Sequence, residues 1–167
     1  MSILTKTSTL SMSAGALIIR VMLGSVMFGH GAQKVLGWWG GSGLEATVAG
    51  MGQKFPEILV YAAAFSEFLG GLFLIIGLLT RPAAVFVATT MFVASMQHVA
   101  GGFFAANKGM EFPLTLAMMA VAVLFFGPGK YSIDAILASR NAAEPANKTI
   151  EPAVRSKVDP SRNTARA

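Results

Sequence analysis

The chain has 167 residues, of which 54% are hydrophobic and only 13% charged, with a formal net charge of +5 and a mean hydropathy of +0.61. An ordinary soluble domain carries roughly a quarter charged residues, so the composition excludes a typical soluble globular protein, and the length allows one compact domain. Because there is no cysteine, disulfides, thiolate zinc sites, cysteine-ligated clusters and thiol relays are excluded. Redox chemistry would need a bound cofactor, a quinone or a partner.

Four apolar stretches predict membrane-spanning helices, because a spanning helix needs about 20 residues. They cover residues 14–36, 58–79, 82–100 and 112–128. They lack the alternation of barrel strands, and a bilayer admits only helices or closed barrels. We therefore expect an all-α integral membrane four-helix bundle.

The bundle is expected to occupy residues 1–138 and to be followed by a disordered basic tail over 139–167. A cleaved signal is the alternative for the first stretch, but no small-residue cleavage site follows it, so we expect it to be retained. The basic tail predicts either a topology anchor or a weak attraction to anionic lipid or nucleic acid. We favour the anchor and expect no nucleic-acid partner.

The distribution of basic residues predicts the orientation of the helices in the membrane. Lys6, Arg81 and the basic residues after residue 128 fall on one side of the predicted helices, and three lysines fall on the other. Positive charge collects on the cytoplasmic side. Both termini should therefore be cytoplasmic, with residues 37–57 and 101–111 outside.

Helical geometry gathers the polar residues of the first stretch on one face. At about 100° per residue, Arg20, Gly24, His30, Gly31 and Lys34 share one third of the circumference. A charged group in hydrocarbon costs about 2.5 to 3.5 kcal/mol even on a lenient scale, and glycines allow close helix approach. This stripe should face the bundle.

The second stretch places a carboxylate among small residues. Glu67 shares its face with Ala63, Ala64, Gly70 and Gly71, so another helix can approach closely there. A rise of about 1.5 Å per residue puts Arg20 about 9 Å, and Glu67 about 18 Å, from the inner end. A long arginine spans that difference, so a buried Arg20–Glu67 pair is predicted, with either an architectural or a functional role.

Two histidines are predicted at the outer ends of helices. His30 and His98 should lie at comparable depth, where they could ligate a haem axially, bind a quinone carbonyl or relay a proton, or simply pack. We expect a colourless protein without haem, and no metal site.

Glu111 stands at the start of the fourth stretch, where it suits either the positive end of the helix dipole or a site. Two glycine-rich outer segments bring aromatic rings to the same end of the bundle. We expect His30, Lys34, His98 and Glu111 to surround an outer cavity suited to a quinone head group.

Several motifs together resemble the DoxX family of small bacterial membrane proteins. The segment 20–44 is similar to the family's opening signature, and it is followed in the expected order by EFLGG at 67–71, GLLTR at 77–81, NKGMEFP at 107–113 and GPGKYSID at 127–134. The residues matching recurrent family positions are Arg20, Gly24, His30, Gly31, Lys34, Glu67, Gly70, Gly71, Arg81, Glu111 and Pro113.

The resemblance implies an inner-membrane protein tied to redox metabolism. Such relatives include a subunit of a thiosulfate:quinone oxidoreductase and proteins that assist soluble enzymes in oxidative-stress defence. The expected function is therefore the membrane subunit of a quinone-linked oxidoreductase with a soluble or protein partner. A non-enzymatic membrane scaffold or small-solute carrier is the alternative, and the absence of cysteine argues against direct sulfur chemistry on this chain.

Overall fold

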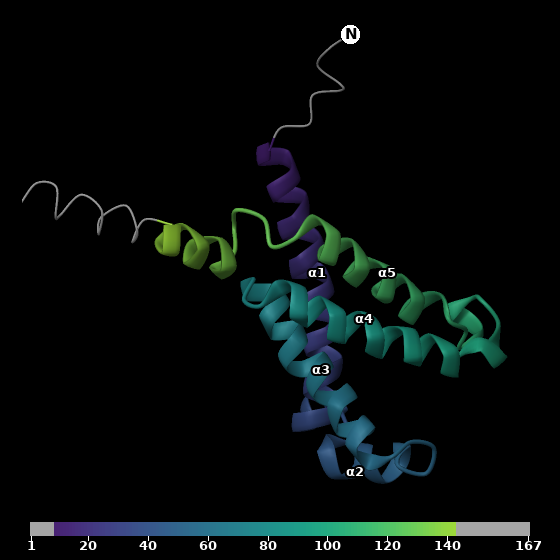
Figure 1. The fold of residues 1–167 in the computed structure, drawn as a ribbon. Helices are drawn as coiled ribbons and strands as arrows, with labels where there is room; N and C mark the ends of the chain where they lie inside the picture. The colour runs from purple at the N-terminus through teal and green to yellow at the C-terminus, as the bar shows by residue number, and fades with distance from the viewer. Residues whose placement is uncertain (1–8, 143–167) are drawn as a thin grey trace, which may run out of the picture.

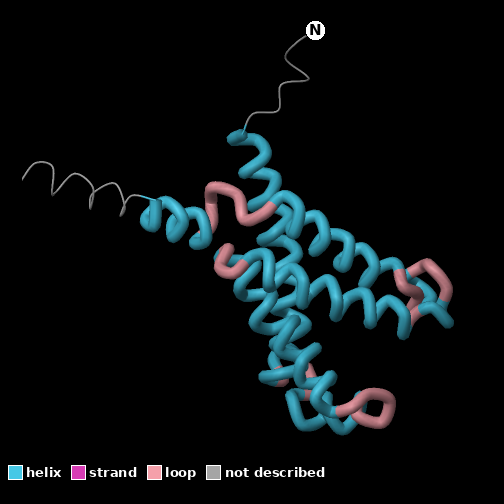
Figure 2. The backbone as a smooth tube through the Cα atoms, viewed as in Figure 1, coloured by secondary structure: helices cyan, strands magenta, loops and turns pink. Residues whose placement is uncertain are grey.

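The computed structural model describes residues 9–142, and these residues form helices joined by loops without any strand (Figures 1 and 2). The prediction of an all-α fold is confirmed. The long helices are α1 (Thr9–Leu36), α3 (Glu57–Ile76), α4 (Thr80–Gln97) and α5 (Glu111–Phe126). A short helix, α2 (Gly43–Met51), and the turns Trp38–Gly40, Val99–Gly101 and Ala105–Asn107 lie between them.

Two helices lie where none was expected. The first is α2, inside the segment predicted as an outer loop, and the second covers residues 133–142. Ser132 begins the second one, because its Oγ accepts a hydrogen bond from the Ala135 N–H at 3.1 Å, as an N-cap serine does. The prediction of disorder is therefore wrong for residues 139–142, and residues 143–167 lie outside the described part of the chain.

The helices form two pairs that diverge from one end of the molecule. α1 packs along α3 and α4 packs along α5, while α3 and α4 contact each other. Figure 1 shows α3 and α4 pointing in different directions from the turn that joins them. We call this end, where α1 and α4 begin and α3 and α5 end, the closed end, and the opposite one the open end.

Glycines set the close contact between α1 and α3. A Cβ atom added at Gly31 would lie 2.3 Å from the Phe68 backbone nitrogen, and one added at Gly71 would lie 2.4 Å from the Phe28 nitrogen. The two backbones therefore touch where each helix lacks a side chain, as small residues permit in membrane helices. Apolar side chains of α1 and α3, such as Leu23 and Leu74, join those of α4 and α5 in one buried core.

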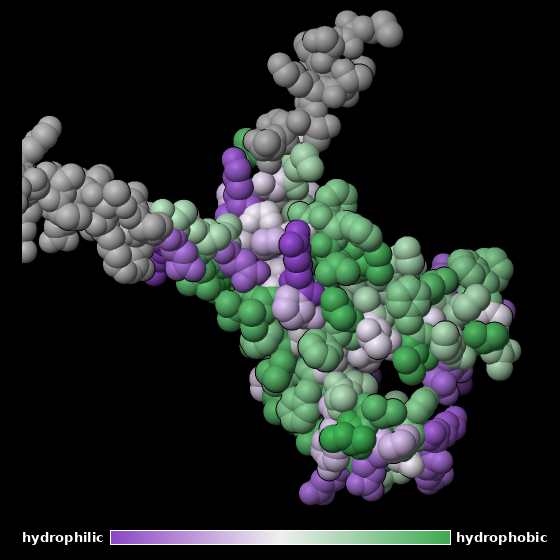
Figure 3. Space-filling model, in the orientation of Figure 1, coloured by the Kyte–Doolittle hydropathy of each residue, from purple (hydrophilic) through white to green (hydrophobic). Residues whose placement is uncertain are grey.

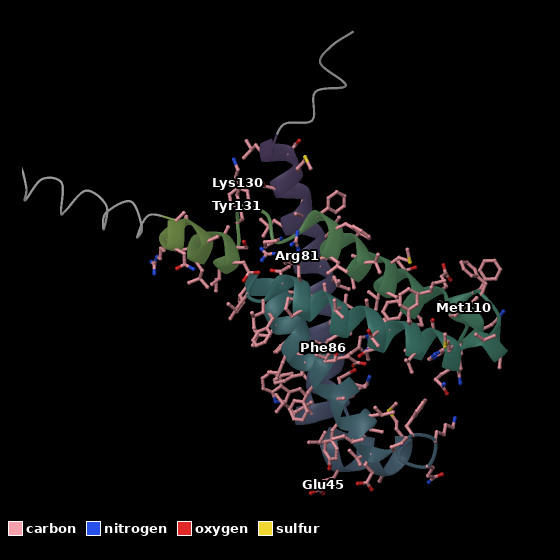
Figure 4. All side chains as sticks on the ribbon, viewed as in Figure 1. Glu45, Arg81, Phe86, Met110, Lys130 and Tyr131 are labelled. Atoms are coloured by element: carbon pink, nitrogen blue, oxygen red, sulfur yellow. The ribbon has the colours of Figure 1, made fainter. Side chains whose placement is uncertain are left out.

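A buried arginine ties the segment after α5 to the closed end. Arg20 is 1% exposed, and its Nη2 donates a hydrogen bond to the Tyr131 carbonyl oxygen at 2.5 Å. A Cβ added at Gly77, at the end of α3, would lie only 1.5 Å from Arg20 Nη1, so the guanidinium occupies the space that glycine leaves. In Figure 4, Tyr131, Lys130 and Arg81 all lie at this end.

Asp134 fixes the turn between α3 and α4. Its carboxylate accepts hydrogen bonds from the N–H groups of Leu79 and Thr80, at 2.8 and 2.9 Å, which are unpaired donors at the start of a helix. Its own N–H donates to the Gly77 carbonyl at 2.9 Å. The motifs at 77–81 and 127–134 are thus held together by one carboxylate.

The described helices suit an apolar environment. Those over Leu10–Leu36 and Glu57–Ile76 are long and apolar enough to cross a membrane, and α5 is apolar but shorter. Large apolar side chains remain on the surface, including Phe86 at 65% and Phe125 at 81% exposure, and Figure 3 shows wide hydrophobic surface over α4 and α5. Apolar surface of this extent marks contact with lipid or protein.

Candidate functional site

A lysine and a glutamate form an ion pair between α1 and α3. Lys34 Nζ lies 2.5 Å from Glu67 Oε1. The glutamate side chain is 3% exposed and the lysine side chain 32%, so the carboxylate is the buried member. Charges removed from water in this way need a partner, and Lys34 supplies it.

The local sequence explains how the two side chains meet. A Cβ at Gly31 would fall 2.7 Å from the Glu67 carbonyl carbon, so α1 touches α3 at the glutamate, and Lys34 follows less than one turn later. Thr47 of α2 reaches back to the same place, with its Oγ1 3.3 Å from the Lys34 carbonyl oxygen and 3.1 Å from Ser42 Oγ. The short helix therefore holds the end of α1 beside the pair.

The ion pair lies in the wall of a cleft of about 510 Å³ between α3 and α4. Most of the wall is apolar, and Phe86, which Figure 4 labels, belongs to it. The polar residues that line the cleft are Lys34, Thr47, Ser66, Glu67, Thr89, Thr90 and Gln97. A mainly apolar pocket with a few polar groups is the usual design of a small-molecule site.

One oxygen in this wall has no partner. Glu67 Oε2 is buried and accepts no hydrogen bond from any residue that the structure describes. The Thr90 hydroxyl cannot supply a hydrogen to it, because Thr90 Oγ1 donates to Ser66 Oγ at 3.0 Å. An unpaired buried acceptor is costly, so Oε2 is an acceptor beside the cleft that needs a donor.

The predicted Arg20–Glu67 pair does not form. The structure places Glu67 with Lys34 and Arg20 with the Tyr131 carbonyl. Both residues are buried on the faces that the helical arithmetic gave them, at 1% and 2% exposure. The error lies in the depth, because Gly31 is the residue of α1 that lies beside Glu67, and 11 residues at about 1.5 Å each put Arg20 about 16 Å farther along the helix. Side chains also tilt toward the N-terminus of their own helix, so Arg20 leans toward the closed end and Glu67 toward the open end.

The two histidines lie outside the cleft wall. His30 is exposed and its ring packs edge-on against Phe112, with centroids 5.9 Å apart. His98 is exposed at the end of α4, with Nδ1 2.8 Å from the Ala94 carbonyl oxygen. Of the four residues expected around one outer cavity, only Lys34 lines the cleft.

Glu111 holds the loop before α5. Its Oε2 accepts a hydrogen bond from the Ala105 N–H at 2.9 Å, and its own N–H donates to the Phe103 carbonyl at 2.8 Å. It also lines a second, shallower pocket of about 440 Å³ with Phe103, Thr115 and Met118. Glu111 is thus separate from the Lys34–Glu67 cleft and fixes the loop conformation.

The α4 side of the cleft was not found from the sequence. Thr89 and Thr90 interrupt an apolar stretch, and Ser66 stands beside Glu67. Paired hydroxyls on two neighbouring predicted helices are a usable signal, because such side chains hydrogen-bond across membrane helices.

Comparisons with known proteins give one family match and two curated relatives. The model of the DoxX family matches residues 15–100, a range that contains Arg20, Lys34 and Glu67. CatD of Bacillus subtilis (strain 168), named as a candidate oxidoreductase, is 29% identical over 114 residues, which are 68% of this chain and 81% of CatD. The inner membrane protein YqjF of Escherichia coli (strain K12) is 29% identical over 126 residues, 74% of this chain and 92% of YqjF. No solved structure matches the chain.

Proposed function

Since this chain belongs to the DoxX family and resides in the bacterial inner membrane, we propose that it is the membrane subunit of a quinone-linked oxidoreductase. Its role is to hold the quinone in the membrane while a protein partner or soluble redox enzyme supplies the electrons. CatD, the relative named as a candidate oxidoreductase, supports this class of function. The proposal involves neither haem nor metal.

The main support for the proposal is the cleft whose wall contains the Lys34–Glu67 ion pair. Its volume of about 510 Å³ falls within the usual range of small-ligand sites, about 300 to 1,000 Å³. A quinone has a flat ring bearing oxygens and an apolar tail, and the cleft offers a polar pair at Lys34 and Glu67 and apolar side chains such as Phe86 elsewhere.

The polar and the apolar residues of the cleft have different roles in binding. An ammonium has three donors, and Glu67 occupies one of those of Lys34, so Lys34 can donate to a ring oxygen. The apolar side chains of α3 and α4 hold the tail and exclude water. Arg20 and Asp134 act at a distance by fixing the closed end of the helices that form the cleft.

A photoreactive decyl-quinone tests this proposal. The purified protein in lipid nanodiscs should be labelled on α3 and α4 peptides, and unlabelled decyl-quinone should compete. Lys34→Met should weaken saturable binding about tenfold or more, the usual worth of a hydrogen bond to a charged group. Lys108→Met is the matched control, because Lys108 lies outside the cleft wall.

A second variant separates loss of the site from loss of the fold. Ala62 lines the cleft, is exposed and does not share the face of Glu67, because only residues three or four apart are neighbours on a helix. Ala62→Leu narrows the cleft away from the ion pair, so binding should fall while the melting temperature stays close to that of the wild type. Labelling confined to α5, or binding that neither variant changes, contradicts the proposal. In that case the Lys34–Glu67 pair would have the architectural role of a scaffold.

A further inference from the structure

We propose that the cleft prefers the hydroxyl-bearing, reduced form of its ligand, a quinol, and that Glu67 Oε2 accepts the hydrogen bond of that hydroxyl. This inference rests on the proposed function, which places a quinone or quinol in the cleft. It adds the redox form that the cleft selects and the atom responsible for the selection.

The first step is the unpaired carboxylate oxygen. Oε1 of Glu67 is engaged by Lys34, whereas Oε2 is buried and has no partner among residues 9–142. An ionised carboxylate can only accept hydrogen bonds. A ligand group that satisfies Oε2 must therefore carry a hydrogen, as a phenolic hydroxyl does and a quinone carbonyl does not.

The second step is the lysine beside it. Lys34 Nζ lies 2.5 Å from Glu67 Oε1 and has donors to spare. The pair thus offers an acceptor and a donor at one place in an apolar wall. A ligand hydroxyl can use both groups, because it donates its hydrogen to Oε2 and accepts from Lys34 through its oxygen. A ligand carbonyl can only accept, so it leaves Oε2 unpaired and brings its own lone pairs close to those of Oε2.

The third step is the charge of the acceptor. Two neighbouring side chains already have partners, because Thr90 donates to Ser66 and Thr47 bonds with Ser42 and with the Lys34 carbonyl. Among the residues that the structure describes, Glu67 is the one acidic residue in the lining of the cleft, and hydrogen bonds to a charged acceptor are stronger than those to a neutral one. Glu67 is therefore the group of this wall that most strongly favours a hydroxyl over a carbonyl.

Three probes with the same ring and decyl tail test the inference: the quinol, the quinone and the quinol dimethyl ether. Each competes with the photoreactive analogue on the wild-type protein in nanodiscs, under anaerobic reducing conditions for the quinol and without reductant for the other two. The quinol should bind about tenfold or more tightly than the quinone and the ether, because hydrogen bonds to charged groups are worth at least that factor.

Glu67→Gln should reverse the preference between quinol and quinone. The glutamine oxygen can still accept from Lys34, and its NH₂ group then takes the place of Oε2 and donates, which favours a carbonyl. Glu57→Gln on the same helix is the control, because Glu57 is exposed and outside the cleft wall. It should leave the order of the three probes unchanged.

The outcomes distinguish this inference from the proposed function. Equal affinity of the wild-type protein for all three probes overturns the quinol preference and leaves quinone binding intact. Absence of saturable binding by any of them overturns the proposed function itself. If Glu67→Gln does not fold, the comparison of quinol with dimethyl ether on the wild-type protein still tests the quinol preference. The ether keeps the two oxygens of the quinol but lacks the hydrogens that it would donate.

Discussion

Arg20 and Lys34 lie on the same stripe of α1, yet their side chains meet partners at opposite ends of the molecule. Their separation explains this, because 14 residues of α1 at about 1.5 Å each put them about 21 Å apart along the helix. Glu67 lies beside Gly31, near Lys34, and on the antiparallel α3 its side chain leans toward the open end. At the residue scale, the register between the two helices decides the ion pair, and side-chain direction adds to it.

A double-mutant cycle checks this pairing. Lys34→Met should destabilise the protein by about 3 to 5 kcal/mol, because it leaves the buried Glu67 carboxylate without its partner. Glu67→Leu should cost less, because the Lys34 side chain is 32% exposed and its ammonium can turn toward water. The double variant should recover much of the loss. The measurement is the melting temperature in detergent, which is monitored by fluorescence-detected size-exclusion chromatography.

The control cycle combines Arg20→Leu with Glu67→Leu. Their losses should add, because side chains that share no contact behave independently. Recovery in this second cycle, together with additive losses in the first, would contradict the pairing seen in the structure.

The sequence was sufficient to place these residues on buried faces but insufficient to pair them. The 3.6-residue period finds the stripes that contain Arg20 and Glu67, because only one face of each helix is rich in small residues. The partner depends on the register between the two helices and on the Tyr131 carbonyl, which is 111 residues away in the chain. A backbone acceptor carries no residue-type signal that a sequence pattern could reveal.

At the scale of elements, the contact between α1 and α3 depends on backbone proximity at a few glycines. These were predictable, because glycines on the polar stripe indicate close helix approach. The helices that were missed are short: α2 has 9 residues, and the other covers only residues 133–142. The one over residues 133–142 depends on the Ser132 cap, a local signal that the hydropathy pattern does not contain.

Gly31→Ala should separate α1 from α3. The added Cβ would meet backbone atoms of Phe68 at 2.3 and 2.4 Å, and backbone cannot move aside as a side chain can. Overpacking of this kind costs about 1 to 3 kcal/mol, so the melting temperature should fall measurably.

Gly29→Ala is the matched control on the same helix. A Cβ at Gly29 meets nothing within 4 Å, and alanine is the better helix former by about 1 kcal/mol, so the melting temperature should hold or rise. Equal effects of the two substitutions would show that α1 and α3 do not touch at Gly31.

At the scale of the whole molecule, the start of α1 and the helix over residues 133–142 both lie toward the closed end, whereas α2 lies at the far end (Figure 1). We expect the closed end to face the cytoplasm, because Arg81 and Lys130 lie there (Figure 4) and positive charge collects on the cytoplasmic side.

Reporter fusions check the orientation. Alkaline phosphatase, which is active outside the inner membrane, should be inactive when fused after Ala167 and active when inserted after Gly52 in the segment before α3. A green fluorescent protein should give the opposite result at both positions. The reason is the excess of positive charge on the cytoplasmic side, and an external Ala167 would contradict it.

The hydrogen bond between Arg20 and Tyr131 also sets an order of events during synthesis. Tyr131 follows Arg20 by 111 residues, and ribosomes add roughly 5 to 20 residues per second. For several seconds, α1 therefore exists before its arginine has the carbonyl that it binds in the finished fold. During that time the guanidinium must be held by water or lipid head groups near the membrane surface, as long basic side chains allow. Assembly of the closed end is consequently a late step of biogenesis, and a nascent chain stalled before residue 131 would present Arg20 to the insertion machinery.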